Sequence, residues 1–152
     1  MRPGDPAFPF SLPDEQGVTR TLGEFLVRGP VVLFFYPAAM SPGCTAESCH
    51  FRDLGAEFSA LGATRLGISR DDPAAQRRFS ERHGFDFPLL SDADGEVASH
   101  YGVRRRLRVL PTRRWTFVIG TDGRVAAMTR SETRMAAHAD RALAVLREMA
   151  AT

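Results

Sequence analysis

One segment constrains this chain more than any other: an apolar strand, a turn, and then a cysteine where a helix should begin. Residues 30–36 read PVVLFFY, which is typical of a buried strand. Residues 37–43 contain the prolines, serine and glycine of a turn, and apolar side chains recur at helical spacing over residues 46–61. We therefore expect Cys44 in the first turn of a helix that follows a central strand.

That position favours the thiolate form of a cysteine. The first N–H groups of a helix have no partner within it, and the positive end of the helix dipole attracts an anion. The thiolate, and not the thiol, is the nucleophile. Cys44 is therefore a candidate catalytic nucleophile, although cysteine is also among the most buried residue types and a lone cysteine is often a core residue.

The composition suits a soluble, single globular unit. With 152 residues, 43% of them hydrophobic, we expect one domain over residues 1–152. The sequence has neither an apolar run of membrane-spanning length nor a secretory leader pattern, so we expect a cytoplasmic protein that makes no membrane contact. Two cysteines are too few for a disulfide scaffold, and they are better read as reagents.

The charge pattern argues against a nucleic-acid partner. All 20 basic residues are arginine, but the net charge is only +2. The basic run at residues 104–108 is interpreted as a solvated loop or helix face, because no matching positive stripe occurs elsewhere. Residues 103–111 are predicted to be the most flexible loop of the chain.

The rest of the pattern alternates strands with helices. The helix that ends near residue 83 should begin at the Asp-Asp-Pro signal of residues 71–73, and the last helix should be capped by Ser131. Two helical crossovers and a terminal hairpin predict an α/β fold, with a mixed central sheet and helices on both faces. The expected elements are a hairpin at 8–21, a helical turn at 22–27, strands at 63–69, 87–91, 115–120 and 124–129, and helices at 72–83, 94–101 and 131–149.

With these motifs in hand, the sequence resembles the peroxiredoxins, and within them the peroxiredoxin Q group, also called bacterioferritin comigratory proteins. The family pattern of proline, three residues, threonine or serine, two residues and cysteine is met by Pro37, Ser41 and Cys44. The resemblance covers nearly the whole chain and implies a thioredoxin-like fold and a thiol-dependent peroxidase. The other matching segments are residues 10–14, 35–37, 42–47, 51–53, 66–71, 87–92 and 114–119.

The resemblance also implies a role for each site residue. Cys44 would attack the peroxide O–O bond, while the Ser41 hydroxyl and the backbone N–H groups of Gly43 and Cys44 would hold the peroxide oxygens. Arg114 would stabilise both the thiolate and the leaving oxygen as a permanent cation. Pro37 would shield the oxidised sulfur from further oxidation.

Three further positions bear on the roles assigned to Arg114 and to the peroxide loop. Arg113 is chemically identical to Arg114 but points to the opposite face of a strand, and only the family register selects Arg114. Glu47, one turn after Cys44, is expected to fix a guanidinium through a bidentate pair. Met40 departs from the family pattern, which commonly has a small polar or charged residue at this position.

The second cysteine, Cys49, would by the same resemblance be the resolving cysteine that attacks the sulfenic acid of Cys44. On an intact helix, five residues rise about 7.5 Å and turn about 140°. That separation exceeds the Cα distance of about 7 Å that a disulfide tolerates. If both cysteines are helical, the first turns must melt, and Gly43, Thr45 and Ser48 would ease this. Alternatively, Cys49 is a packed helix residue and an external thiol resolves the enzyme.

Two other functions stay open from the sequence. A general thiol-disulfide oxidoreductase usually has a Cys-x-x-Cys spacing, which is absent here, and a redox sensor would oxidise without turnover. No metal or other cofactor is expected. The expected partners are a peroxide and a thioredoxin-type reductant, and the expected assembly is a monomer or weak homodimer. The histidines are interpreted as surface or structural residues: His50, His83, His100 and His138.

Overall fold

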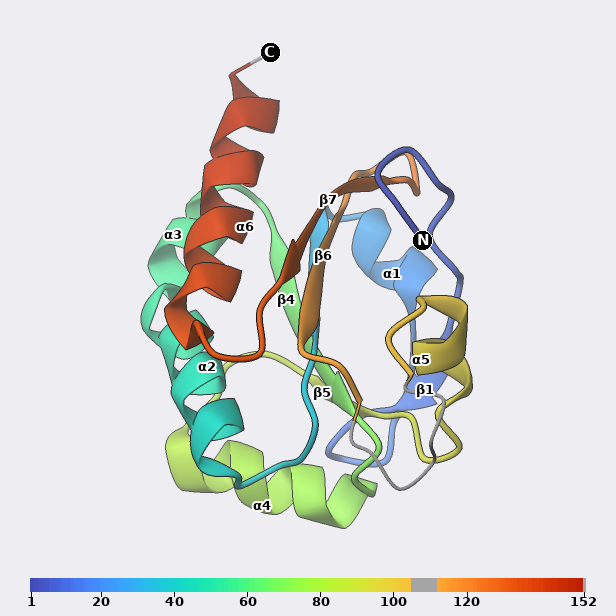
Figure 1. Cartoon of the computed structure of the whole chain (residues 1–152), viewed down its shortest axis with the longest axis vertical. Helices are drawn as coiled ribbons and strands as arrows, with labels where there is room; N and C mark the ends of the chain where they lie inside the picture. The colour runs from blue at the N-terminus through green and yellow to red at the C-terminus, as the bar shows by residue number, and fades with distance from the viewer. Residues whose placement is uncertain (105–111, 152) are drawn as a thin grey trace.

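The computed structural model, which describes residues 1–104 and 112–151, contains a five-stranded mixed sheet at its centre (Figure 1). The strand order is β5-β4-β3-β6-β7. Strands β4 and β5 run parallel to β3, whereas β6 is antiparallel to β3 and β7 to β6. This arrangement confirms the predicted α/β, thioredoxin-like fold. The strands are β3 (Val31–Phe35), β4 (Thr64–Ser69), β5 (Leu89–Ser91), β6 (Trp115–Ile119) and β7 (Val125–Arg130).

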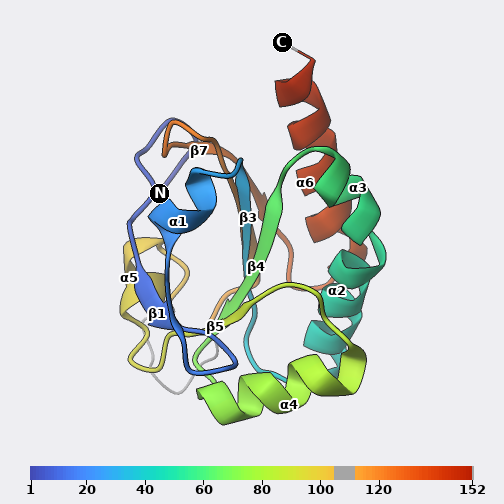
Figure 2. The same ribbon diagram turned by 180° about the vertical axis from the view of Figure 1, so that it is seen from behind.

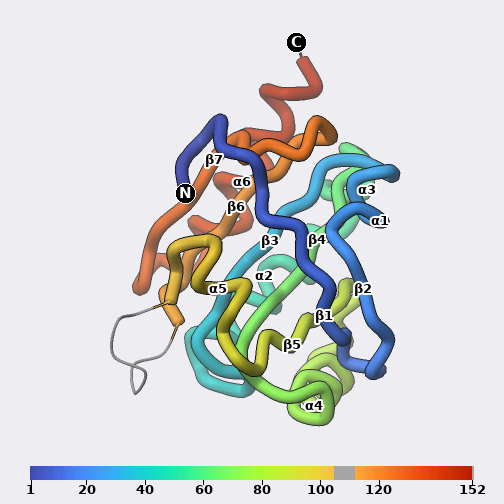
Figure 3. Tube along the Cα trace, turned by 90° about the vertical axis from the view of Figure 1, so that its right-hand side faces the viewer, coloured from blue at the N-terminus to red at the C-terminus, as the bar shows by residue number. Residues whose placement is uncertain are grey.

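Helices cover both faces of this sheet, as Figure 1 and the reverse view in Figure 2 show. On one face lie α2 (Pro42–Asp53), α3 (Gly55–Ala60) and α6 (Met135–Ala150). The other face carries α1 (Leu22–Leu26), α5 (Glu96–His100) and the small hairpin of β1 (Ser11–Pro13) and β2 (Thr19–Thr21), which is seen in front of the sheet in Figure 3. Helix α4 (Pro73–His83) crosses one end of the molecule beside β5.

The central strand explains why the molecule has two cores. All five residues of β3 are buried, because alternate side chains point to opposite faces of a sheet that is covered on both sides. Leu33 and Phe35 pack with α1 and α5, whereas Val32 and Phe34 pack with α2 and α6. The second core contains Cys44, so the predicted nucleophile lies on the α2 and α6 face.

Two details of the predicted helices are wrong. Helix α2 begins at Pro42, with Cys44 in its first turn as expected, but the helical segment predicted to run to residue 61 breaks at Leu54, which leaves the helical conformation between α2 and α3. Helix α6 begins at Met135, not at residue 131. The Ser131 hydroxyl instead accepts a hydrogen bond from the N–H of Arg134, so it closes a turn before the helix begins.

Two sequence predictions meet the limits of the described residues. The loop predicted at 103–111 and the basic run at 104–108 fall mostly outside them. Among the described residues, no helix combines the length and apolar character needed to cross a lipid bilayer.

Candidate active site

Cys44 is the third residue of α2 and is completely buried. The chain leaves β3 at Phe35, turns, and enters the helix at Pro42. The first hydrogen bond of the helix runs from the N–H of Thr45 to the carbonyl of Ser41, 2.9 Å away. The N–H groups of Gly43 and Cys44 come before that bond and lie at the open end of the helix. A small polar ligand beside the sulfur can therefore receive hydrogen bonds from the backbone.

The turn before the helix is held from the neighbouring strand. The N–H of Ala39 donates to Asp71 Oδ2 at 2.8 Å, and the Ser69 hydroxyl at the end of β4 donates to the same oxygen at 2.6 Å. Ser41 Oγ donates to the carbonyl of Ala38 at 2.9 Å, which leaves its lone pairs to accept a proton from a ligand. Met40 has a φ of 69°, a strained value for a residue other than glycine, and its side chain is exposed.

Arg114 brings a buried positive charge to the sulfur. Because β6 is antiparallel to β3, the residue just before β6 lies at the same end of the sheet as the turn that follows β3. Arg114 Nη2 is 3.4 Å from Cys44 Sγ, and the arginine is only 6% exposed. Arg113 is exposed, and its guanidinium lies 6.0 Å from the ring of Trp115. Of the two adjacent arginines, therefore, only Arg114 contacts Cys44.

Glu47 shares the same guanidinium. Its Oε1 accepts from Arg114 Nη1 at 3.2 Å, and its side chain is completely buried. The contact is a single hydrogen bond and not the predicted bidentate pair, because Nη2 turns to the sulfur and Glu47 Oε2 faces His138. Burial raises the pKa of Glu47 to about 8, although Arg114 opposes this shift. The uncharged form of the carboxyl is therefore favoured more than in an ordinary glutamate, and that form leaves more of the arginine charge to Cys44.

The sequence interpretation missed the residues that support this pair. His138, predicted to be a surface or structural residue, is buried, and its Nε2 lies 3.4 Å from Glu47 Oε2. The backbone of Arg114 is held by the segment after β7: its N–H donates to Glu132 Oε1 at 3.1 Å, and its carbonyl accepts from the N–H of Ser131 at 3.4 Å. One signal was available, since His138 falls on the apolar stripe of its helix, where a polar residue needs a buried partner.

Cys49 lies in the same helix as Cys44 but in a different environment. Both cysteines are free thiols, and Cys49 is only half-buried. Since α2 is helical from Pro42 to Asp53, the condition for the predicted melting is met. The five-residue spacing puts the two Cα atoms roughly 9 Å apart in a regular helix, too far for a disulfide. Pro37 follows β3 by two residues and is half-buried.

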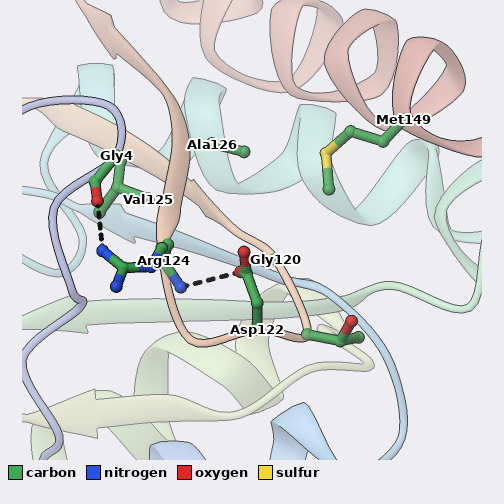
Figure 4. Close-up of a pocket in the computed structure, with 8 residues that line it drawn as sticks. Gly4, Gly120, Asp122, Arg124, Val125, Ala126 and Met149 are labelled. Atoms are coloured by element: carbon green, nitrogen blue, oxygen red, sulfur yellow. Dashed lines mark hydrogen bonds between the residues drawn. The ribbon is translucent and has the colours of Figure 1, made fainter. Parts of the chain in front are cut away.

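A separate pocket of about 370 Å³ lies at the other end of the sheet, beside Gly120 and Met149 (Figure 4). The guanidinium of Arg124 in this pocket already has a partner, because its Nη1 donates to the carbonyl of Gly4 at 2.9 Å. The backbone N–H of Arg124 donates to Asp122 Oδ1 at 3.0 Å. The pocket contains none of the predicted site residues. In the described part of the chain, no cluster of histidine, cysteine and carboxylate side chains is arranged to hold a metal ion.

Known proteins are similar to this chain in both sequence and fold. Residues 3–128 match the AhpC/TSA family. The crystal structure of peroxidoxin BcpB from Mycobacterium tuberculosis is 54% identical, covers 98% of each chain and superposes with a TM-score of 0.95. Peroxiredoxin Q of Xanthomonas campestris is 34% identical over 93% of this chain and 91% of that one, with a TM-score of 0.86. The chloroplastic peroxiredoxin Q of Populus jackii is 35% identical over 92% of this chain and 65% of its own length.

Proposed function

Since the chain belongs to the AhpC/TSA family, as a thiol peroxidase of its peroxiredoxin Q group, we propose that Cys44 reduces hydroperoxides and that Cys49 resolves the oxidised enzyme within the same chain. A thioredoxin-type dithiol would then restore both thiols. The observation that carries this proposal is the contact of 3.4 Å between Arg114 Nη2 and Cys44 Sγ in a buried site at the start of a helix.

The first step transfers one peroxide oxygen to sulfur. The Cys44 thiolate attacks one oxygen of the hydroperoxide, an S–O bond forms as the O–O bond breaks, and the leaving oxygen takes up a proton to become water or an alcohol. Ser41 Oγ would accept a hydrogen bond from the bound peroxide, and the N–H groups of Gly43 and Cys44 would donate to its oxygens. Pro37 would shield the resulting sulfenic acid.

Arg114 would stabilise the charge that moves during this step. Its Nη1 and Nη2 contact Glu47 and Cys44, but its buried Nε has no hydrogen-bond partner among the described residues. A buried donor without a partner is costly and calls for an explanation. The leaving oxygen of a bound peroxide would provide that partner, so the cation would favour the transition state more than the ground state.

The second step regenerates the site without a cofactor. The Cys49 thiolate attacks the Cys44 sulfenic acid, an S–S bond forms as the S–O bond breaks, and the departing hydroxide takes up a proton to become water. A dithiol then reduces the disulfide by exchange. Because every named residue comes from one chain, a monomer or a weak dimer can complete this cycle. We place it in the cytoplasm, where thioredoxin-type reductants keep thiols reduced. The Xanthomonas campestris relative is described by its alkyl peroxide reduction activity, and we extend that substrate class to this chain alongside hydrogen peroxide.

Peroxide consumption with and without a thioredoxin system tests this function. The wild-type protein should consume peroxide for many turnovers only when the reductant is present, and Cys44→Ser should be inactive. Peroxidase turnover retained by Cys44→Ser would reject the assignment. Rapid reduction of insulin disulfides without peroxide consumption would favour a general oxidoreductase, and oxidation without turnover would favour a sensor.

A further inference from the structure

His138 lies beside two of the groups that hold Arg114 in place. Its Nε2 is 2.8 Å from the carbonyl of Ser131 and 3.4 Å from Glu47 Oε2, and its Nδ1 is 2.7 Å from Thr116 Oγ1. The imidazole is completely buried. Two of these neighbours form hydrogen bonds with Arg114. Glu47 accepts one from its guanidinium, and the N–H of Ser131 donates one to its backbone carbonyl.

The geometry determines the tautomer of this histidine. A backbone carbonyl can only accept, so Nε2 must carry the proton that points to Ser131. Nδ1 then accepts the hydroxyl proton of Thr116 when the ring is neutral. Burial lowers the pKa of His138, and the nearby Arg114 charge lowers it further, against the opposing contributions of the Ser131 carbonyl and Glu132. The neutral ring therefore has both nitrogens satisfied at neutral pH.

A charged ring would disturb this arrangement. Protonation of Nδ1 would make Thr116 accept instead of donate, and it would place a second cation in the buried site that holds Arg114. The charged or titratable groups around the ring are Glu47 on α2, Arg114 before β6 and Glu132 after β7, with Cys44 beyond Arg114. Apart from Arg114, these groups are acids. The site therefore depends on the position of one guanidinium, which contacts both Glu47 and Cys44.

We propose that His138 is a positioning residue for the peroxidase reaction: through its hydrogen bond to Ser131 it fixes the backbone of Arg114, while its ring packs beside Glu47, so that Nη2 stays on Cys44 Sγ. This inference rests on the proposed function, in which Cys44 is the nucleophile that Arg114 serves. His138 touches neither the sulfur nor, in this geometry, the peroxide. Its effect passes along the hydrogen bonds from His138 to the Ser131 carbonyl and from the Ser131 N–H to the Arg114 carbonyl, and so to the guanidinium on Cys44.

Two amide substitutions separate the two ring nitrogens. In His138→Gln the side-chain amide reaches about as far as Nε2 and can still donate to Ser131, whereas in His138→Asn it reaches only the position of Nδ1, near Thr116. His100→Gln is the control, because His100 is exposed on the opposite face, where it stacks on Phe8. All variants are made in Cys49→Ser, so that Cys44 is the one thiol.

The measurements are the rate of Cys44 oxidation by hydrogen peroxide and the pH profile of Cys44 alkylation by iodoacetamide. We expect His138→Asn to slow oxidation on the order of tenfold, equivalent to about 1.4 kcal/mol, and to move the alkylation profile to higher pH. His138→Gln should stay within about threefold of the parent, and His100→Gln should match it. Equal rates in the Asn and Gln variants would overturn the proposal, as would a loss of unfolding free energy without any change in the pH profile.

Thr116→Val provides a second route if His138→Asn does not fold. It keeps the side-chain volume but removes the contact at Nδ1, the same contact that His138→Gln loses, so oxidation should slow by no more than about threefold and the alkylation profile should shift only slightly. A loss as large as tenfold in this variant would place the effect at Nδ1 instead of at the Ser131 contact and would contradict the proposal. Failure of the proposed function looks different: the parent would then not react with peroxide, while the alkylation profile would still report whether His138 acts on Cys44.

Discussion

The two ends of helix α2 are built differently, although each carries a cysteine. At the beginning, Cys44 is buried against Arg114, and the N-cap residue Ser41 makes no side-chain hydrogen bond to the helix. After Cys49, the helix is tied to three other elements. Arg52 Nη1 donates to the carbonyl of His83, Arg65 Nη1 donates to the carbonyl of Phe51, and His50 contacts Asp140, all at 2.7 Å.

This difference indicates which end gives way when the two sulfurs must meet. In the proposed cycle, the attraction between Arg114 and a Cys44 thiolate helps to hold the beginning of α2, and oxidation to a neutral sulfenic acid removes that charge. The far end depends on neutral backbone acceptors and an outer ion pair, which oxidation does not alter. We therefore expect the first turns to unfold after oxidation, while the end near Asp53 stays attached.

The largest effect that tests this contrast is expected from Cys49→Ser. Without the second thiol, thioredoxin-supported turnover should fall to background, while the first oxidation of Cys44 should keep its wild-type rate. The sulfenic acid should then persist, react with a dimedone-type reagent, and overoxidise more readily at high peroxide. Undiminished turnover in this variant would show that an external thiol resolves Cys44 and that Cys49 is only a packed helix residue.

A smaller loss is expected from Arg114→Ala, with Arg113→Ala as the matched control. Removing one preorganised charge from the reaction site should slow peroxide attack by roughly a hundredfold or more. Arg113 faces Trp115 on the opposite side of the strand, so its variant should keep nearly the wild-type rate. Stopped-flow measurement of Cys44 oxidation distinguishes the two, and equal losses would contradict the assignment of Arg114.

The smallest effect concerns stability at the buried end of α2. The pKa of Glu47 is about 8 in the folded protein against an ordinary value of 4.5, so the folded state binds more protons between these values. The contribution of Glu47 to stability must therefore fall as the pH rises through this window. In Glu47→Gln this dependence should disappear. Denaturant unfolding of both proteins from pH 5 to pH 9 measures it, and a constant difference would show that Glu47 keeps an ordinary pKa.

Much of the architecture was predictable because local pattern and burial agree. The apolar run of β3, the Asp72 cap of α4 and the hairpin turn at residues 14–17 each indicate their structure within a few residues. The break at Leu54 was not predictable in this way. The apolar periodicity continues through it, and only the structure shows how closely the chain packs there: a Cβ on Gly55 would meet Asp86 Oδ2 at 3.1 Å and Arg65 Nη2 at 3.2 Å.

The site residues also differ in how well the sequence could predict them. Four of the predicted site residues lie within one stretch of 11 residues, where the sequence spacing alone constrains their geometry: Pro37, Ser41, Cys44 and Glu47. Arg114 is distant in sequence, and the family register was needed to choose it over Arg113. The contact of His138 with Glu47 joins residues 91 positions apart on two packed helices, and no periodicity encodes which residue of one helix faces which residue of the other.

The most direct test of the account is amide exchange and thiol titration after oxidation with one equivalent of peroxide. We expect two titratable thiols to disappear per chain, a monomer on a non-reducing gel, and a peptide that links Cys44 to Cys49. Amide exchange should increase in the segment from Cys44 toward Asp53, most strongly in the first turns, and stay unchanged in α6. A disulfide-linked dimer as the main product, or unchanged exchange in α2, would contradict resolution by local unfolding within one chain.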